Sequence, residues 1–240
     1  MATEMGNKGR QGERQANDAW EKILKAGVAA QRFVPGSICV GGTAVALYAH
    51  HRISHDTDHL LPNLRSRFEE VLAALESQPD WKTARVQPPV LILGSIEQVQ
   101  VGFRQLMRSS AVETETLDTP AGKLVVPTLD ELLCMKAFLA YRRNATRDYL
   151  DFAALSTCAP EKDVIASLLK LDERYGEIQT VSVGLEVAKV LSAAAPFDLN
   201  EAELQHYKGL AEKWQKWGAT RSICNHFGVL LGEALVNRQR

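Results

Sequence analysis

The sequence lacks the features that mark a membrane protein, a disulfide-rich secreted protein or a strongly basic nucleic-acid binder. No apolar run approaches the roughly 20 residues that span a bilayer. The four cysteines are scattered and form no CxxC pair, as expected for buried free thiols in a reduced compartment. The formal net charge is −1, so any nucleic-acid contact must come from a local patch. We expect a cytoplasmic globular protein with no membrane partner.

The order of predicted elements indicates an α+β fold in which strands precede most of the helices. Residues 1–17 are polar and have no apolar core of the signal-peptide type, and we expect them to be a disordered N-terminal tail. Residues 18–126 predict a mixed sheet with helices, and residues 127–240 predict a helical domain that completes a cleft. The boundary is marked by Pro127, after which Thr128 and Glu131 form a helix capping box.

Periodicity and turn residues predict the individual elements. Strands are expected at residues 37–40, 57–61, 81–86, 90–93, 99–103 and 123–126. Helices are expected at residues 16–32, 44–50, 68–75, 128–143, 147–156, 161–171, 181–194, 201–210 and 213–236.

The most informative segment is a glycine turn followed by two aspartates. Gly41-Gly42-Thr43 joins an apolar strand to a helix, where free backbone N–H groups can bind phosphate oxygens. Asp56 and Asp58 are separated by one residue, so a strand would direct both carboxylates to one face. Two like charges at one place favour a bound divalent cation, and Mg²⁺ accepts one or two carboxylates together with phosphate oxygens. The combination predicts a site for a metal-bound nucleoside triphosphate.

A second group of charged residues follows in the helical half. Lys136 lies among apolar residues of a predicted helix, where it either reaches phosphate oxygens or extends its ammonium group to solvent. Three arginines at 142, 143 and 147 form a cluster that suits phosphate or RNA backbone contact, although such a corner can also be simply solvated. Asp148 and Asp151 are spaced to share one helix face.

These segments occur in an order that resembles a known family. Gly41-Gly42-Thr43-Ala44, the run from His51 to Asp58, and Lys136 followed by Arg147-Asp148-Tyr149-Leu150-Asp151 are similar to its G-G-T-A, H-R-x-S-x-D-x-D and K … R-D-x-x-D patterns. The chain thus resembles the AbiEii/AbiGii toxins, which are minimal nucleotidyltransferases of the DNA polymerase β superfamily. The resemblance covers about residues 35–155.

The resemblance implies transfer of a nucleoside monophosphate from a triphosphate to an acceptor hydroxyl, with tRNA or another RNA as acceptor and an antitoxin protein as partner. It assigns Mg²⁺ to Asp56 and Asp58. It assigns nucleotide binding to Gly41, Gly42, Thr43, Arg52, Lys136 and Arg147. It assigns catalytic roles to Asp56, Asp58, Lys136 and Asp148.

Some residues depart from the family pattern. A third carboxylate is expected on a later strand, where this chain has Gln100 or Gly102, and an apolar residue is usual where it has His59. The first departure leaves open a protein that binds nucleotide or a partner without catalysis, or shifts the base role to Asp148. An aminoglycoside-modifying enzyme is a third reading, which the arginine cluster opposes. His51, His55 and His59 would form a metal triad only on one continuous helix, and the predicted elements separate them.

Overall fold

A computed structural model describes the backbone of residues 2–204, 207 and 209–238, and the side chains from residue 17 onward within these ranges. The chain forms two compact units. A sheet unit comprises Met1–Ala44, Ile53–Leu106 and Glu115–Val126, and a helical unit comprises Val45–Arg52, Met107–Thr114 and Pro127–Arg240. The units are therefore interleaved along the chain, in contrast to the contiguous domains 18–126 and 127–240 that the sequence suggested.

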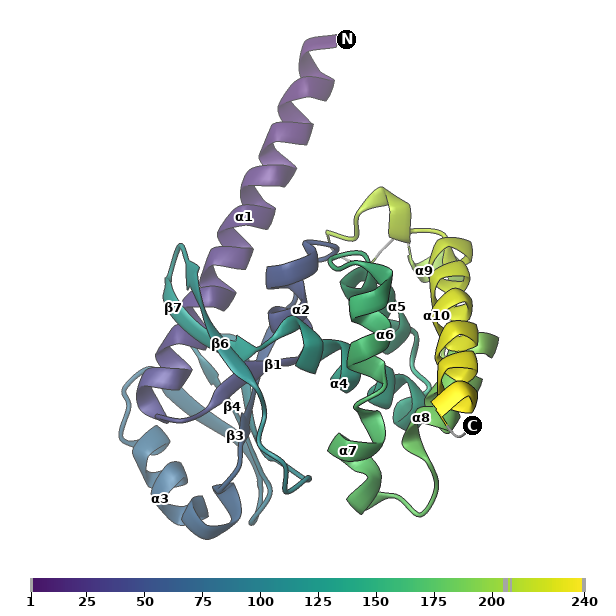
Figure 1. Ribbon diagram of the computed structural model, residues 1–240. Helices are drawn as coiled ribbons and strands as arrows, with labels where there is room; N and C mark the ends of the chain where they lie inside the picture. Colours follow the sequence, from purple (N-terminus) through teal and green to yellow (C-terminus); the bar gives the residue numbers. More distant parts are fainter. Residues whose placement is uncertain (1, 205–206, 208, 239–240) are drawn as a thin grey trace. The chain divides into compact units, whose positions relative to one another are not determined.

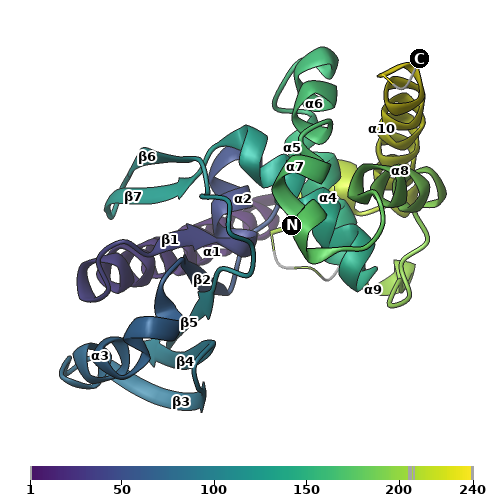
Figure 2. The same ribbon diagram turned by 60° about the horizontal axis from the view of Figure 1, so that its bottom comes forward.

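The sheet unit is built on five strands in the order β1-β2-β5-β4-β3, which Figure 2 shows side by side. The strands are β1 (Ile38–Val40), β2 (Asp56–Leu61), β3 (Trp81–Gln87), β4 (Leu91–Ile96) and β5 (Val99–Gln105). Only β2 and β5 pair in parallel, whereas the other neighbours are antiparallel. This mixed sheet, with helices around it and a helical part after it, confirms the predicted α+β class.

Two helices contribute to the core on one face of this sheet. The core joins residues of α1 (Ala2–Phe33) and α3 (Leu64–Glu76) to inward side chains of the strands; these are Ala26, Ala30, Val34, Leu61, Leu64, Phe68, Val71, Leu75, Trp81, Ile92, Ile96, Val101 and Phe103. Burial of this apolar surface is the main stabilising contribution in the unit. The long α1 includes residues 2–17, for which the sequence predicted disorder, and its good helix formers Glu, Lys, Arg and Gln account for the difference (Figure 1).

A two-stranded hairpin completes the sheet unit. It pairs β6 (Thr114–Thr119) with β7 (Gly122–Pro127), and only the second strand was predicted. The β6 sequence Thr-Glu-Thr-Leu-Asp-Thr is mostly exposed and carries few apolar residues, so its pattern gave little indication of a strand. The side-chain amide of Gln31 donates a hydrogen bond to the Val125 carbonyl oxygen at 2.7 Å and accepts one from the Val125 N–H at 2.9 Å. These two bonds connect the hairpin to α1.

The helical unit contains the helices after Pro127 and the end of α2 (Gly41–Ala49). Its helices are α4 (Leu129–Arg143), α5 (Thr146–Ser156), α6 (Glu161–Leu168), α7 (Leu171–Tyr175), α8 (Val183–Ala193), α9 (Glu201–Leu204) and α10 (Trp217–Arg238), with short 3₁₀ turns at Gly176–Ile178 and Glu212–Trp214. The predicted helix at 201–210 extends over residues 205–206 and 208, which lie outside the described residues. The last predicted helix begins at 217 instead of 213. In both views α10 lies along α8 (Figures 1 and 2).

The α4 helix has the ends that its sequence predicted. The Thr128 hydroxyl accepts a hydrogen bond from the Glu131 N–H at 3.3 Å, as in a capping box. At the other end Asn144 adopts the left-handed conformation that stops the helix, with φ of 49°. Lys136 is therefore carried by a helix whose length and position are determined locally.

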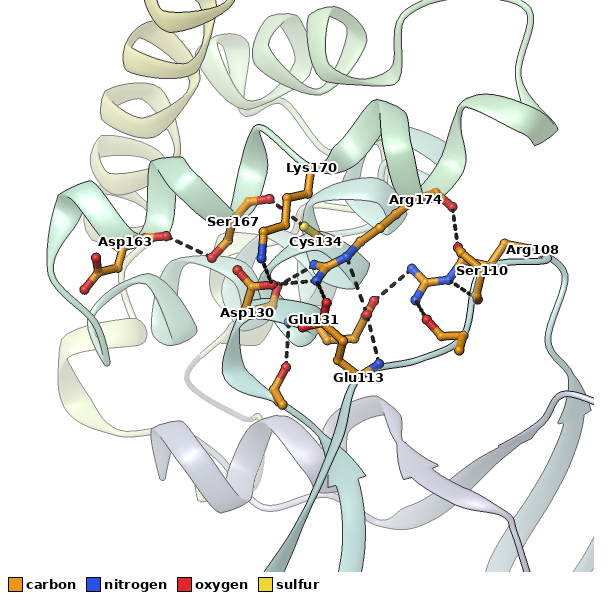
Figure 3. A network of polar contacts seen from close by, with 12 residues as sticks. Arg108, Ser110, Glu113, Asp130, Glu131, Cys134, Asp163, Ser167, Lys170 and Arg174 are labelled. Atoms are coloured by element: carbon orange, nitrogen blue, oxygen red, sulfur yellow. Dashed lines mark hydrogen bonds and ion pairs between the residues drawn. The ribbon is translucent and has the colours of Figure 1, made fainter.

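A buried network of charges holds the segment Met107–Thr114 in the helical unit (Figure 3). Arg108 and Glu131 are both buried, with Nη1 and Oε1 2.8 Å apart. This is an ion contact without hydrogen-bond alignment, because neither atom has a hydrogen-bond partner. Arg174 reaches Glu131 and also Asp130 and Glu113. Buried charges are tolerated only when they are paired. Because removal of Met107–Thr114 would leave the Glu131 carboxylate without Arg108, this network holds the segment in the helical unit.

The cysteines and helices match the expectations from composition, with one exception. All four cysteines are free, and Cys39, Cys134 and Cys224 are buried as predicted, whereas Cys158 is exposed. Burial raises the pKa of Cys39 to about 12, so this thiol is an inert core group. Among the described residues, no helix has both the length and the apolar character that crossing a bilayer demands.

Candidate functional site

The aspartate pair lies on β2, on the face of the sheet opposite the apolar core. Burial alternates along the strand, with Asp56 and Asp58 partly exposed and Thr57 and His59 buried. The two buried side chains contact each other, because Thr57 Oγ1 lies 3.0 Å from His59 Nε2, and Thr57 Oγ1 also lies 3.4 Å from Cys39 Sγ. The strand therefore directs both carboxylates to one side, as the alternation in the sequence predicted.

The glycine turn lies directly beside these carboxylates. Gly41 has φ of +69°, and a Cβ atom on it would lie 3.2 Å from Asp58 Oδ2. A side chain here would need both a strained backbone and room that the carboxylate already takes, so glycine is required at this position. Gly41 and Gly42 are partly exposed at the start of α2, where N–H groups have no helical partners.

Two hydroxyl groups hold the backbone and side chain of Asp56. Thr43 is buried, and its hydroxyl donates to the Asp56 carbonyl at 2.6 Å. Ser54 donates to Asp56 Oδ1 at 3.1 Å. The resemblance assigned Thr43 to nucleotide binding. In this structure the Thr43 hydroxyl donates its hydrogen bond to the Asp56 carbonyl oxygen. Thr43 thus links the glycine turn to the aspartate strand.

The neighbouring strand β5 presents no carboxylate to this face. In the parallel register Gln100 lies opposite Asp56, and Gly102 lies opposite Asp58. Arg104 is next on the same face, and its Nε lies 3.3 Å from Asp58 Oδ1. Glu97 lies before β5, in the turn that follows β4, as expected. The strand on which the family pattern places a third carboxylate is therefore adjacent to the aspartate strand. The residues that it presents on this face are Gln100, Gly102 and Arg104.

The donor set on this face suits a hard cation with few protein ligands. Within the described residues, no group of three or more His, Cys, Asp or Glu side chains is placed to hold a metal ion. Asp56 and Asp58 remain as two adjacent, partly exposed carboxylates, which is the protein contribution that Mg²⁺ commonly accepts when phosphates and water complete its shell. The residues fit Mg²⁺, and the ion itself stays a prediction.

The helical unit contains the second group of predicted residues, arranged around Asp151. The Asp151 carboxylate is fully buried. It accepts two hydrogen bonds from the Arg52 guanidinium, with an Nε–Oδ1 distance of 2.9 Å and an Nη2–Oδ2 distance of 3.0 Å. Nε2 of His51 lies 2.8 Å from Oδ1, and Nζ of Lys136 lies 2.8 Å from Oδ2. Burial alone would raise the pKa of Asp151, but the Lys136 and Arg52 charges and these hydrogen bonds hold it well below its usual range.

Lys136 and Asp148 form the inner part of this cluster. Lys136 is buried, and its ammonium group contacts Asp148 Oδ1 at 3.1 Å in addition to Asp151. Asp148 is also fully buried, and its Oδ2 atom has no hydrogen-bond partner. Of the two interpretations of Lys136, extension of the ammonium to solvent is wrong for this structure. The nucleotide contact of Lys136 and the catalytic role of Asp148 stay predictions.

The remaining predicted residues are distributed over both units. Arg142, Arg143 and Arg147 are exposed around the α4–α5 corner. The histidines do not form a triad: His51 bonds Asp151 in the helical unit, and His59 is buried in the sheet unit. Trp214 and Trp217 are buried in the core of the helical unit.

One residue of these clusters was not indicated by the sequence: Arg104, which contacts Asp58. His51 and Asp151 belong to the motifs that carry the resemblance, but their mutual contact, and the convergence of His51, Arg52 and Lys136 on Asp151, were not predicted. The signal for Arg104 was available in part, because residues 100, 102 and 104 alternate on one strand. The partner strand and its register could not be read from that alternation.

The chain is similar to a protein family, to a longer mycobacterial protein and to a solved structure. A family described as nucleotidyl transferase AbiEii toxin, type IV toxin–antitoxin system, matches residues 38–220. The heme uptake protein MmpL11 of Mycobacterium tuberculosis is 30% identical over 171 residues, which cover 70% of this chain but only 16% of that protein. A crystal structure assigned as a nucleotidyltransferase from H. pylori has a TM-score of 0.53 at 14% identity, and the match covers 94% of this chain and 98% of that one. This structural likeness concerns the fold alone.

Proposed function

Because this chain belongs to the AbiEii family of nucleotidyl transferase toxins, we propose that it is a Mg²⁺-dependent enzyme that transfers a nucleoside monophosphate from a nucleoside triphosphate to RNA. The family also supports a type IV antitoxin as its partner. The acceptor we expect is a hydroxyl group of tRNA or another RNA. The observation that carries the proposal is the pair Asp56 and Asp58 on the open face of β2, next to the Gly41-Gly42 turn.

The residues of the sheet unit are suited to bind and orient a triphosphate. Asp56 and Asp58 would hold Mg²⁺, which when bound neutralises phosphate charge and fixes the direction of in-line attack. Thr43 and Ser54 hold Asp56 in place through its carbonyl and carboxylate oxygens. Backbone N–H groups at the start of α2, beside the carboxylates, can donate hydrogen bonds to phosphate oxygens. Positioning and charge neutralisation are the main demands of this chemistry.

The helical unit offers groups for proton transfer and for RNA contact. Asp148 has one carboxylate oxygen without a partner, so it has the capacity to accept the proton of an acceptor hydroxyl. Asp151 fixes Lys136 and Arg52, which we expect to serve the nucleotide phosphates. The exposed arginines at 142, 143 and 147 can contact an RNA backbone without reading its sequence.

The test is incubation of the full chain with Mg²⁺, total RNA and each α-³²P-labelled nucleoside triphosphate. We expect label in a discrete RNA band, and we expect Asp56→Asn to reduce it by roughly 100-fold or more because the metal loses a charged ligand. Asp118→Asn is the matched control, since this carboxylate is exposed on β6. Undiminished labelling by Asp56→Asn would contradict the proposed site.

A second function is favoured by the row Gln100, Gly102 and Arg104, which supplies no third carboxylate. The chain would then bind a triphosphate, or a partner protein, without catalysis. This alternative predicts Mg²⁺-dependent triphosphate binding, with no label transfer to any acceptor and no release of pyrophosphate. Any reproducible transfer product that depends on Asp56 excludes it.

A further inference from the structure

Arg104 is the charged residue of β5 on the face that carries the aspartates. The parallel register places Gln100 opposite Asp56 and Gly102 opposite Asp58, and alternation brings Arg104 to the same face. The other face of this strand contributes Val101 and Phe103 to the core. The row that faces the proposed metal thus adds a positive charge instead of a third negative one.

Gly102 excludes a carboxylate opposite Asp58 for a steric reason. A Cβ atom at this position would lie 2.8 Å from Asp58 Oδ1 and 3.0 Å from Leu93 Cδ2. Any side chain here would force the aspartate to move. The formal charge of the face is then −2 from Asp56 and Asp58 and +1 from Arg104, a net −1. A face with fewer negative charges attracts fewer cations.

The contact between Arg104 and Asp58 is weak enough for Arg104 to leave the carboxylate and bind phosphate oxygens instead. Their Nε–Oδ1 distance is 3.3 Å, and the side chains are 45% and 31% exposed. Exposed ion pairs contribute little stability, so breaking this one costs little. A guanidinium group also matches the geometry of phosphate oxygens, to which it can donate two parallel hydrogen bonds.

We propose that Arg104 is the second cation of this site, which takes a single Mg²⁺. Arg104 pairs with Asp58 in the protein without metal, and it binds the β- and γ-phosphate oxygens when the metal-bound triphosphate is present. This inference rests on the proposed function. In the transfer, the acceptor oxygen forms a bond to the α-phosphorus and loses its proton to the base, which the proposed function assigns to Asp148. The bond from the α-phosphorus to the bridging oxygen breaks, and pyrophosphate leaves with that electron pair. Arg104 stabilises the charge that develops on this leaving group.

The proposal predicts effects of opposite sign in two binding measurements. Without nucleotide, Arg104→Gln binds Mn²⁺ about 3-fold or more tightly than the wild type, measured from the EPR signal of free Mn²⁺, because a competing cation is removed. With Mg²⁺, the same variant binds a non-hydrolysable triphosphate analogue roughly 10-fold more weakly by calorimetry, because a charge-assisted hydrogen bond is lost. The affinity for a nucleoside monophosphate is unchanged, and Arg104→Lys is intermediate.

Arg85→Gln is the matched control, since it removes an exposed arginine from β3 of the same sheet and leaves both affinities unchanged. Wild-type affinities in Arg104→Gln would overturn the inference, as would two Mn²⁺ ions bound per chain in the presence of the analogue. Asp56→Asn separates the two proposals. If it loses Mn²⁺ binding and label transfer while Arg104→Gln changes nothing, only the role of Arg104 fails. If Asp56→Asn binds Mn²⁺ like the wild type, the metal site of the proposed function fails.

Discussion

At the scale of single residues, burial decides what each titratable side chain does. His59 is completely buried, stacks on Phe103 with ring centroids 5.3 Å apart, and bonds Thr57. Burial lowers its pKa to about 3, so it is a neutral core residue. This explains how the chain accepts histidine where the family usually has an apolar side chain. His51, in contrast, lies next to the Asp151 carboxylate.

We predict that His59 makes the protein sensitive to acid. Between pH 6.5 and about 3 the unfolded chain binds a proton on this imidazole and the folded chain does not, so stability falls as the pH falls through this window. The loss is up to about 1.4 kcal/mol for each pH unit. His59→Leu should reduce the slope of the unfolding free energy against pH, measured by urea unfolding from pH 7.5 to 4.5. His55→Gln alters an exposed histidine and should keep the wild-type slope. Equal slopes in wild type and His59→Leu would contradict the prediction.

At the scale of elements, close approach between helices depends on single glycines. Where α10 contacts α8, a Cβ atom on Gly228 would lie 2.4 Å from the Ser192 backbone nitrogen and 2.9 Å from the Ala188 carbonyl oxygen. Backbone atoms cannot move aside as a flexible side chain can. Gly232 lies one turn further along α10, and a Cβ atom there would meet only Ala188 Cβ at 4.0 Å. Two glycines of one helix thus differ in the space around them.

This difference gives a matched pair of substitutions. Gly228→Ala should lower the free energy of unfolding by about 2 kcal/mol, because it overpacks the contact between the two helices. Gly232→Ala should leave stability unchanged or raise it by up to about 1 kcal/mol, because alanine favours helix more than glycine does. Urea unfolding of both variants, followed by circular dichroism, measures the difference. The idea is excluded if the two variants are equally stable.

At the scale of the whole molecule, two short segments from the first half of the chain belong to the helical unit. Val45–Arg52 brings Arg52 and His51 to Asp151, and Met107–Thr114 brings Arg108 to Glu131. In both cases a buried carboxylate depends on partners far away in the sequence. Removing a partner from a buried charge is strongly destabilising, by about 3–5 kcal/mol for each pair.

We therefore predict that residues 127–240 do not fold on their own. The fragment would keep Glu131 and Asp151 but lose Arg108, Arg52 and His51. Its amide NMR spectrum should lack dispersion and its thermal melt should lack a cooperative transition. The full chain, purified in the same way, is the control. A dispersed spectrum and a cooperative melt of the fragment would show that the two segments are dispensable.

The sequence by itself determined the features that depend on neighbours in the chain. Alternation placed Asp56 and Asp58 on one face of a strand, the capping box placed the start of α4 at Thr128, and Asn144 marked its end. The order of these segments was enough to identify the family. Each of these features is local, because the period of a strand or helix acts over a few residues.

Only the tertiary structure decided which distant residues meet. It placed Gly102 opposite Asp58, set Arg104 beside that carboxylate, and surrounded Asp151 with Lys136, Arg52 and His51. The contact of Arg104 with Asp58 joins residues 46 apart in the sequence, and the contact of His51 with Asp151 joins residues 100 apart, so both result from tertiary packing. A sequence pattern of short period carries no information about such pairings, since a shift of one residue in register would direct every side chain to the other face.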